Sequence, residues 1–426
     1  MHLTRIPTCL CLAACVAATS SAQIVRIAPQ QLMPRAPGCP EAPEATLTSP
    51  TGVAQDAFGY DAMEIDGRIF VGQRGDDTLG LNVGSVRIYH ETPQGWQEEA
   101  VLTSGLVNQQ FGWSLAAHAG RLVVGAPGSG DGLTPGTVHV FEEIEGTWVP
   151  TDVLTGNPGK RSGFGMAVAI EGDTLIVGSP LEDTPASSAG GVVYVFEHDG
   201  NNWTEVAQLT GAVVNGGALG VSVDIEGDVL IAGAPYIANE WIFGKAFVFR
   251  RTQGTWQLEQ ELTHTLPGGR DRFGAAVALH QGRAWVGSPR DLPPNIGAVI
   301  SFDFDQESGF WSAEQTLLAP DYEAFDRFGS SLSLDGPHLV VGAPTWGLLG
   351  RGATGRVYLF DVAGARATFR CAFPPPAPAP QELFGNKVFL QGNRVLIGSP
   401  YDNVVNVDDG SLSIYTLTPG MTTRRR

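Results

Sequence analysis

Charged residues are scarce in this chain of 426 residues. Asp, Glu, Lys and Arg make up 16% of it, where an average soluble protein has about a quarter. This composition argues against a coiled coil or a long exposed helix, both of which need abundant Glu, Lys and Arg. Acids outnumber bases by 44 to 26, and the net charge of −18 disfavours nucleic acid and anionic lipid as partners.

Catalytic motifs are also missing. The eight His residues are scattered without a His-Glu-x-x-His pair, and no Gly-x-Ser-x-Gly segment occurs. His118 and His280 each end an expected strand beside a turn, which suits a surface or core-edge position better than metal ligation. The turn acids fall in different repeats, so no catalytic carboxylate pair can be named. The sequence therefore favours a non-enzymatic protein.

The N-terminus has the pattern of an export signal. Residues 1–22 contain a basic start, a short apolar run and Ser20-Ser21-Ala22, which predicts a secretory signal peptide. An alternative is a lipid anchor at Cys15, because Leu12-Ala13-Ala14-Cys15 resembles a lipobox. We therefore expect a secreted protein, periplasmic or extracellular, with an envelope lipoprotein as the alternative. No other stretch is apolar for the roughly 18 residues that a membrane span needs.

Glycine, by contrast, is abundant, with 55 residues, and much of it lies in a repeat. Phe-Gly recurs every 53 to 56 residues, with Leu-Gly once in its place, and a Gly-Ala-Pro or Gly-Ser-Pro triplet follows 14 residues later in six of seven copies. The first residues of these dipeptides are Phe58, Phe111, Phe164, Leu219, Phe273, Phe328 and Phe384. In the first copy Gly72-Gln73-Arg74 replaces the triplet.

Each repeat predicts four short strands. A strand of small and apolar residues follows Phe-Gly, a Gly turn leads to an apolar second strand, a third strand begins at a Gly, and a fourth usually begins near Trp and ends in Leu-Thr. Seven such units predict an all-β fold, a seven-bladed β-propeller of four-stranded blades. A β-helix or solenoid is the alternative, although it favours shorter units without the fourth-strand Trp.

The chain ends complete each other in this scheme. The last repeat stops after its third strand, while Ala45-Thr46-Leu47-Thr48 precedes Phe58 with the spacing of a fourth strand. An N-terminal strand should thus complete the last blade. Residues 23–44 are then a linker, 45–417 the propeller and 418–426 a disordered basic tail.

Cleavage after Ala22 would leave two cysteines, Cys39 and Cys371. Cys371 falls on the fourth strand of blade six, and Cys39 just precedes the corresponding strand of blade seven. Because these outer strands are neighbours, a disulfide is geometrically reasonable. Two unpaired or buried thiols are the alternative.

Phe-Gly followed by Gly-Ala-Pro in a sevenfold array resembles the FG-GAP repeats of the integrin α-subunit propeller and its bacterial relatives. The resemblance covers residues 45–417 and implies an extracellular role in adhesion or ligand binding, with ligands meeting loops on one face. Many members of that family carry an Asp-x-Asp-x-Asp-Gly calcium loop between the two motifs. Here only short turns with few acids occupy that place, as at Ala119-Gly120-Arg121, too few for the six to eight oxygens of calcium. We therefore expect no cofactor and no family calcium sites.

The loops after Gly-Ala-Pro are the expected ligand face. Aromatic residues beside acids suit carbohydrate stacking or capture of a basic peptide, although solvated turn residues give the same pattern. The candidate ligand-binding residues are Asp76, Asp77, Asp131, Tyr236, Trp241, Arg290, Asp291, Trp346, Tyr401 and Asp402. Asp183, Asp408 and Asp409 lie in the same loops. The segment from Asp402 to Asp409 is rich in acids but lacks the alternate-position spacing of a calcium loop, so a weak cation site there stays an open alternative. Arg74-Gly75-Asp76 matches an integrin-recognised tripeptide and is expected in an exposed loop.

The sequence thus predicts an exported, non-enzymatic binding or adhesion propeller with a protein or glycan ligand. A propeller hydrolase or lyase acting on carbohydrate and a structural envelope protein are the alternatives.

Overall fold

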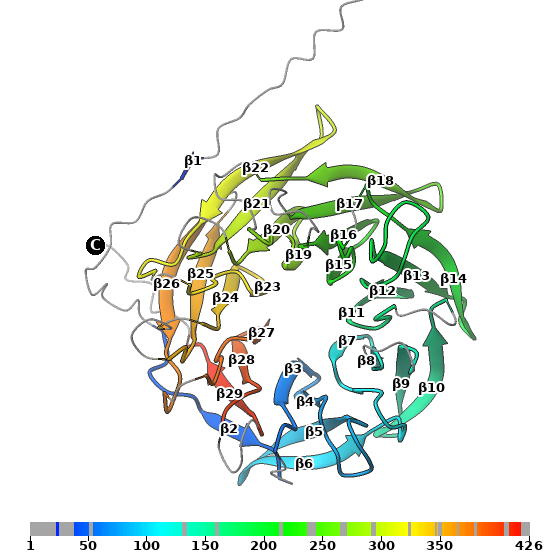
Figure 1. Ribbon diagram of the computed structural model, residues 1–426. Coiled ribbons are helices and arrows are strands. Elements are labelled where there is room, and N and C mark those ends of the chain that lie inside the picture. The colour runs from blue at the N-terminus through cyan, green and yellow to red at the C-terminus, as the bar shows by residue number, and fades with distance from the viewer. Residues whose placement is uncertain are drawn as a thin grey trace, which may run out of the picture.

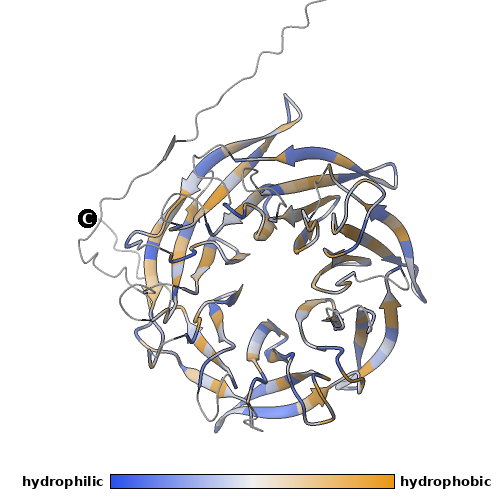
Figure 2. Ribbon diagram, viewed as in Figure 1, coloured by the Kyte–Doolittle hydropathy of each residue, from blue (hydrophilic) through white to orange (hydrophobic). Residues whose placement is uncertain are grey.

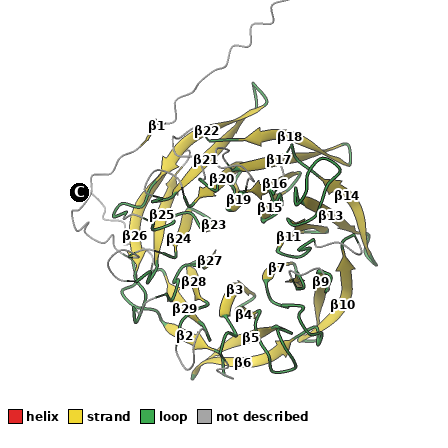
Figure 3. Cartoon of the chain, in the orientation of Figure 1, coloured by secondary structure: helices red, strands yellow, loops and turns green. Residues whose placement is uncertain are grey.

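The computed structural model shows a ring of β-sheets around a central axis (Figure 1). In the part of the chain that it describes, all regular secondary structure is β-strand (Figure 3). The described residues are 23–24, 38–50, 54–129, 134–157, 162–212, 216–236, 244–264, 271–290, 295–322, 325–345, 347, 352–363, 366–378, 381–403 and 409–418. The expected signal peptide, Cys15 and nearly all of the expected tail lie outside these ranges.

The first four blades follow the predicted pattern of four strands, from the centre of the ring outward. Their strands are β3 (Phe58–Ile65), β4 (Arg68–Gln73), β5 (Ser85–Thr92) and β6 (Gly95–Leu102); β7 (Ser114–His118), β8 (Arg121–Ala126), β9 (Thr137–Ile144) and β10 (Thr147–Thr155); β11 (Ala167–Glu171), β12 (Thr174–Ser179), β13 (Val192–His198) and β14 (Trp203–Leu209); and β15 (Ser222–Glu226), β16 (Val229–Ala234), β17 (Lys245–Thr252) and β18 (Thr255–Leu262).

Blades five and six repeat this pattern, and blade seven takes its outer strand from the N-terminal part of the chain. Their strands are β19 (Ala276–His280), β20 (Arg283–Ser288), β21 (Ala298–Asp305) and β22 (Phe310–Leu317); β23 (Ser331–Asp335), β24 (His338–Ala343), β25 (Arg356–Ala363) and β26 (Arg366–Phe373); and β27 (Lys387–Gln391), β28 (Arg394–Ser399), β29 (Ser411–Thr416) and β2 (Ala45–Thr48). A two-residue strand, β1 (Gln23–Ile24), adds in parallel to β22, within the segment expected to be a linker. The seven-bladed, four-stranded prediction is confirmed, with this small addition to blade five.

The repeated glycines allow neighbouring blades to touch through their backbones. The Gly of each Gly-Ala-Pro triplet lies against the Phe-Gly carbonyl of the next blade. A Cβ built at Gly233 would meet the Gly274 oxygen at 1.9 Å, and one at Gly178 would meet the Gly220 oxygen at 2.0 Å. Real Cβ atoms do not come so close, so only glycine fits this contact. The two sequence motifs are therefore the two sides of one interface between blades.

Apolar side chains fill the space between the blades. The second strands are almost wholly buried, whereas the outermost strands alternate between exposed and covered residues, and Figure 2 shows long polar stretches on them. Fourth-strand Trp side chains pack into five of the seven gaps. Trp148 of β10, for example, packs edge-on against Phe70 of the preceding blade, with ring centroids 5.2 Å apart. Each core cluster thus belongs to two adjacent blades.

The ring is closed by the start of the chain, as predicted. β2 pairs antiparallel with β29, from Ala45 opposite Ile414 to Thr48 opposite Ser411. At the centre, a Cβ on Gly398 would meet the Gly59 oxygen at 2.2 Å, so blades seven and one make the same contact as the other pairs. An ion pair of 3.1 Å joins Lys387 of blade seven to Asp61 of blade one.

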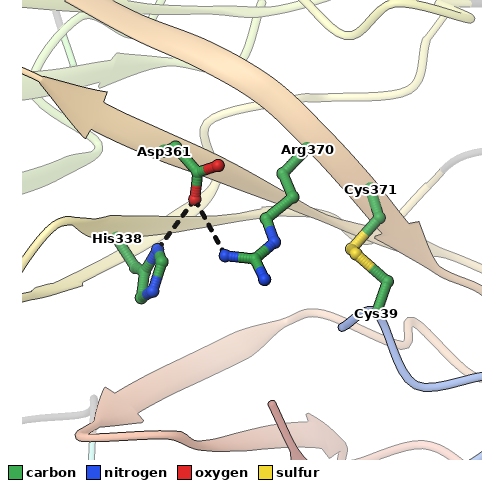
Figure 4. Close-up of a disulfide and its surroundings, with 5 residues drawn as sticks. All are labelled: Cys39, His338, Asp361, Arg370 and Cys371. Carbon is green, nitrogen blue, oxygen red and sulfur yellow. Dashed lines mark hydrogen bonds and ion pairs between the residues drawn. A yellow bond between two sulfur atoms is a disulfide. The ribbon is translucent and has the colours of Figure 1, made fainter. Parts of the chain in front are cut away.

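A disulfide joins the start of the chain to the neighbouring blade. Cys39 and Cys371 are bonded in the structure, with a Cα–Cα distance of 6.3 Å (Figure 4). Cys371 lies on β26 and is buried among apolar residues of blades six and seven. In the same strand Arg370 bonds Asp361, which also contacts His338. The disulfide therefore ties the segment before β2 to the outer strand of blade six.

Candidate functional site

One face of the ring carries the loops that follow the second and fourth strands, and we call it the loop face. On this face the residue before each Phe-Gly pair adopts a left-handed conformation, with φ between 54° and 64° in all seven blades. These residues are Ala57, Gln110, Gly163, Ala218, Arg272, Arg327 and Leu383. The repeat thus gives seven equivalent positions around the axis, and two neighbouring blades place arginine there.

The start of the first strands encloses a central cavity of about 240 Å³. Its lining comes from the residues that follow Phe-Gly, which are mostly small or apolar, with Tyr60, Trp113 and Met166 as the large ones. Asp61 is the single acid among the residues that line it, and its carboxylate accepts the Leu115 amide and pairs with Lys387. The cavity therefore presents no pair of facing carboxylates.

An arginine and three aromatic residues meet at the entrance to this cavity. The rings of Tyr60 and Trp113 lie 5.0 Å apart, and the Arg74 guanidinium lies 4.4 Å from the first ring centre and 4.9 Å from the second. The same guanidinium lies 3.4 Å from the Tyr401 hydroxyl. Burial raises the pKa of Tyr60 to about 12, so it stays a neutral phenol. Arg74 is thus held by cation–π contacts instead of a carboxylate.

A second cationic group lies beside Tyr236. This side chain is 42% exposed, and the Arg272 guanidinium lies 5.1 Å from its ring centre. Arg327, one blade further on, is half-buried, and its pKa is lowered by burial and then by the positive charge of Arg272. Tyr236 also makes a small contribution to the raised pKa of Tyr60, after burial and the nearer groups. We call this set the channel mouth: Tyr60, Arg74, Trp113, Tyr236, Arg272, Arg327 and Tyr401.

Two of the predicted ligand acids hold their own loops in place. Asp76 accepts hydrogen bonds from Ser85 and Thr78, and Asp402 accepts one from Ser411 at 2.7 Å. Burial acts to raise the pKa of Asp76, but these hydroxyls and the Arg87 guanidinium hold it below its usual value. Each of these two acids also has its backbone carbonyl bonded to the glycine that starts the third strand. These carboxylates are occupied within the loop.

The Arg74-Gly75-Asp76 tripeptide does not form the exposed loop expected of it. Asp76 is 5% exposed and lies 3.5 Å from Arg87, while Arg74 is packed between two rings. A Cβ on Gly75 would meet the Gln55 oxygen at 2.2 Å, so the turn is pressed against the neighbouring loop. The expectation of exposure was wrong because the Asp76 carboxylate turns inward and accepts a hydrogen bond from Ser85, the first residue of β5.

The other predicted residues are dispersed. Asp77 is exposed and accepts the Asn82 amide, Asp183 bonds Ser188, and the Arg290 backbone amide bonds the Asp271 carbonyl. Asp409 is buried. The remaining predicted residues fall outside the described part of the chain: Asp131, Trp241, Asp291, Trp346 and Asp408.

The turns that replace the calcium loops have a structural role. Glu226 accepts the amides of Gln281 and Gly282 in the next blade, and Asp335 accepts that of Gly392. These acids thus tie the turns of adjacent blades together. Among the described residues, no three His, Cys, Asp or Glu side chains gather closely enough to hold a metal ion.

Most residues of the channel mouth were not predicted from the sequence. Only Tyr236 and Tyr401 were predicted as ligand residues, and Arg74 was noted as part of the Arg74-Gly75-Asp76 tripeptide. The signal for the others is positional: Tyr60 and Trp113 follow Phe-Gly, while Arg272 and Arg327 precede it. An alignment of the repeats at these two positions would have revealed them.

Comparison with known proteins agrees with this geometry. A model of the FG-GAP repeat family matches residues 96–141, 154–196 and 311–360, each running from a fourth strand to the third strand of the next blade. The chain carries FG-GAP repeats and folds as a seven-bladed β-propeller. Integrin alpha-7 of Mus musculus is 26% identical over 159 residues, which is 34% of this chain and 13% of that protein. Integrin alpha-7 of Rattus norvegicus has the same identity over 34% of this chain and 14% of its own length.

This FG-GAP propeller therefore corresponds to a small part of the integrin chains that it resembles. The recognition made from the repeat is confirmed at the level of family and fold. The described part of the chain holds no helix with the length and hydropathy to span a membrane.

Proposed function

We propose that this FG-GAP propeller is an exported, non-enzymatic binding module that engages a protein ligand through its loop face. The resemblance to integrin α-subunits supports an adhesion-type role. The observation that carries the proposal is a patch of exposed aliphatic residues on the loops of blade one. We call Leu79, Leu81, Leu106 and Val107 the loop patch.

The loop patch is built from two segments that lie side by side. The Asn108 amide bonds the Leu81 carbonyl at 2.8 Å, and the Gln110 amide bonds the Asn82 carbonyl at 3.0 Å. All four loop-patch side chains are between 55% and 64% exposed. The exposed apolar residues of the outer strands, such as Val153 and Leu258, lie on different blades. A contiguous apolar patch on ordered loops is typical of a protein-binding surface.

The geometry gives less support to the alternative of a hydrolase. Glycoside hydrolysis commonly uses two carboxylates on either side of the scissile bond. Asp61 is the one acid that lines the central cavity, and it is ion-paired. We therefore keep binding as the proposed function.

The test is a binding screen with a matched pair of variants. The secreted chain is screened against arrays of extracellular proteins and of glycans, together with Leu79→Gln/Leu106→Gln and, as control, Leu258→Gln on the outer strand β18. We expect a protein ligand whose affinity falls at least tenfold, about 1.4 kcal/mol, in the loop-patch variant and is unchanged in the control. Equal binding by both variants would show that the loop patch does not bind the ligand. Binding to glycans alone would show that the ligand is a glycan and not a protein.

A further inference from the structure

The arginines of the channel mouth differ from most other described arginines because no described carboxylate compensates their positive charge. Most described arginines are ion-paired, as Arg283 is with Asp303 and Arg394 with Glu64 and Glu91. Among the described residues, Arg272 and Arg327 contact no carboxylate. They interact with each other and with Tyr236. The two guanidinium groups occupy equivalent positions on adjacent blades, and their like charges repel unless an anion joins them.

The neighbouring acid does not neutralise them. Asp271 precedes Arg272 in sequence, but its side chain is 1% exposed and accepts the amides of Gly244 and Phe273. Burial raises the pKa of this carboxyl, and its hydrogen bonds to the two amides direct it away from the arginines. Arg74 likewise has aromatic rings and a phenol as its partners. The mouth is therefore a locally cationic site on a chain with a net charge of −18.

The cationic side chains are also held in position before any ligand arrives. Arg272 rests on the Tyr236 ring, and Arg74 lies between two rings. Their backbones are fixed by the repeat, because Arg272 and Arg327 occupy the same left-handed position on adjacent blades, with φ of 58° and 57°. Such order lowers the entropy that binding would otherwise cost.

We propose that the channel mouth is an anion subsite in which Arg272 and Arg327 together bind a side-chain carboxylate of an acidic peptide segment. Guanidinium groups match the planar geometry of a carboxylate with paired hydrogen bonds. The Tyr236 ring packs against the aliphatic part of the acidic side chain, and Arg74 attracts a second carboxylate from across the axis. The proposal rests on the proposed function, since it defines the chemistry of the segment that the protein ligand inserts.

The overall charge favours a short acidic peptide over a long polyanion. A sulfated polysaccharide would bring many charges close to the surface of an acidic protein, and the repulsion would oppose its binding. A peptide that presents one or two carboxylates to the channel mouth is attracted by the arginines there, while the rest of the peptide carries no charge that the acidic surface would repel. The experiment therefore compares an acidic peptide with a sulfated sugar.

The experiment is a calorimetric titration of the secreted chain with terminally blocked peptides. The probes are tetraglutamate, tetraglutamine and tetralysine, with a sulfated tetrasaccharide as a fourth arm. The variants are Arg272→Gln, Arg327→Gln and the double variant. The matched control is Arg366→Gln, which removes the same charge from an exposed arginine at the start of the outer strand β26.

We expect saturable binding of tetraglutamate that weakens at least tenfold in the double variant and stays within twofold in Arg366→Gln. Tetraglutamine and tetralysine should not bind. Tyr236→Ala keeps every charge and should still weaken tetraglutamate several-fold, which provides a readout if the double variant is unstable. No saturable tetraglutamate binding, equal binding by the double variant, or preference for the sulfated sugar would each overturn the proposal.

The loop-patch variant Leu79→Gln/Leu106→Gln separates the two proposals. It should bind tetraglutamate as the parent chain does, because the loop patch takes no part in the subsite. If it loses the protein ligand but keeps tetraglutamate, both proposals stand. If it keeps the protein ligand and tetraglutamate still depends on the arginines, the loop patch fails and the subsite stands.

Discussion

At the scale of single residues, one position of the repeat serves different purposes in different blades. The residue before Phe-Gly is alanine, glycine, glutamine or leucine in five blades and arginine in two. All seven share one backbone conformation, so the arginines differ from the rest in what the side chain offers. A departure from the repeat at a position fixed by the fold therefore indicates function better than composition does.

The predicted acids show why loop composition was a poor guide. Asp76 and Asp402 were named because they follow Gly-Ala-Pro in irregular loops, but each accepts a hydroxyl from the start of a third strand. Sequence shows that a carboxylate is present, while its direction depends on how the loop folds back on the blade. The arginines before Phe-Gly stand out in an alignment of the repeats, but only the structure shows that their position faces the central cavity on the loop face.

Buried histidine gives a pH dependence at this scale. His139 on β9 is 8% exposed, and burial lowers its pKa to about 4 from 6.5. The folded state thus favours the neutral ring, so its stabilising contribution is present above pH 6.5 and is lost as the pH falls toward 4. We predict that, relative to His139→Gln, the parent chain loses about 2 kcal/mol of unfolding free energy between pH 7 and 5.

Urea unfolding at the two pH values measures this difference. His118→Gln, at an exposed strand end, is the control and should follow the parent chain. Parallel pH profiles for the parent and His139→Gln would show that the histidine does not titrate with folding.

At the scale of elements, the strands follow from the sequence closely. Phe-Gly, the Gly turn and Gly-Ala-Pro mark the ends of the first and second strands, because these glycines are required by turns and by contact with the next blade. The fourth strands were less predictable. Six of them carry a bulge opposite the third strand, which turns residues such as Glu99 and Glu259 toward arginines on the same blade. No residue type specifies such a bulge.

The glycine contact between blades gives a prediction for these elements. Gly233→Ala places a methyl group against the Gly274 carbonyl, so the blades must separate. We expect a loss of more than about 3 kcal/mol in unfolding free energy, as for other severe steric changes. Gly227→Ala is the matched control, since its φ of 59° costs only about 1 kcal/mol and no atom lies within 4 Å of the new Cβ.

Chemical denaturation of the two variants provides the measurement. Similar losses in both would mean that backbone conformation, and not the contact between blades, makes Gly233 necessary.

At the scale of the whole molecule, closure of the ring combines three contacts far apart in sequence. β2 pairs with β29, Gly398 meets Gly59, and Cys39 bonds Cys371 across a separation of 332 residues. The strand pairing and the disulfide could be predicted, because the missing fourth strand and the neighbouring outer strands follow from the repeat, whereas the glycine contact appears only in the structure. The loop face as a binding surface could not be predicted, because it depends on which loops lie side by side.

The disulfide gives a prediction for the intact ring. By closing a long loop it restricts the unfolded chain, so Cys39→Ser/Cys371→Ser should lower the unfolding free energy by about 2 to 5 kcal/mol. Differential scanning calorimetry should show a lower melting temperature for this variant than for the parent chain. Reductant should lower the parent to the level of the variant and leave the variant unchanged, whereas a parent insensitive to reductant would contradict the role of the bond.

The pairing of β2 with β29 also has a consequence for biosynthesis. Ala45–Thr48 leaves the ribosome long before its partner Ser411–Thr416 is made. Until then, the nascent propeller is an open arc whose first blade has an uncovered apolar side. Any factor that shields this side until β29 emerges would protect the arc before this long-range pairing can form.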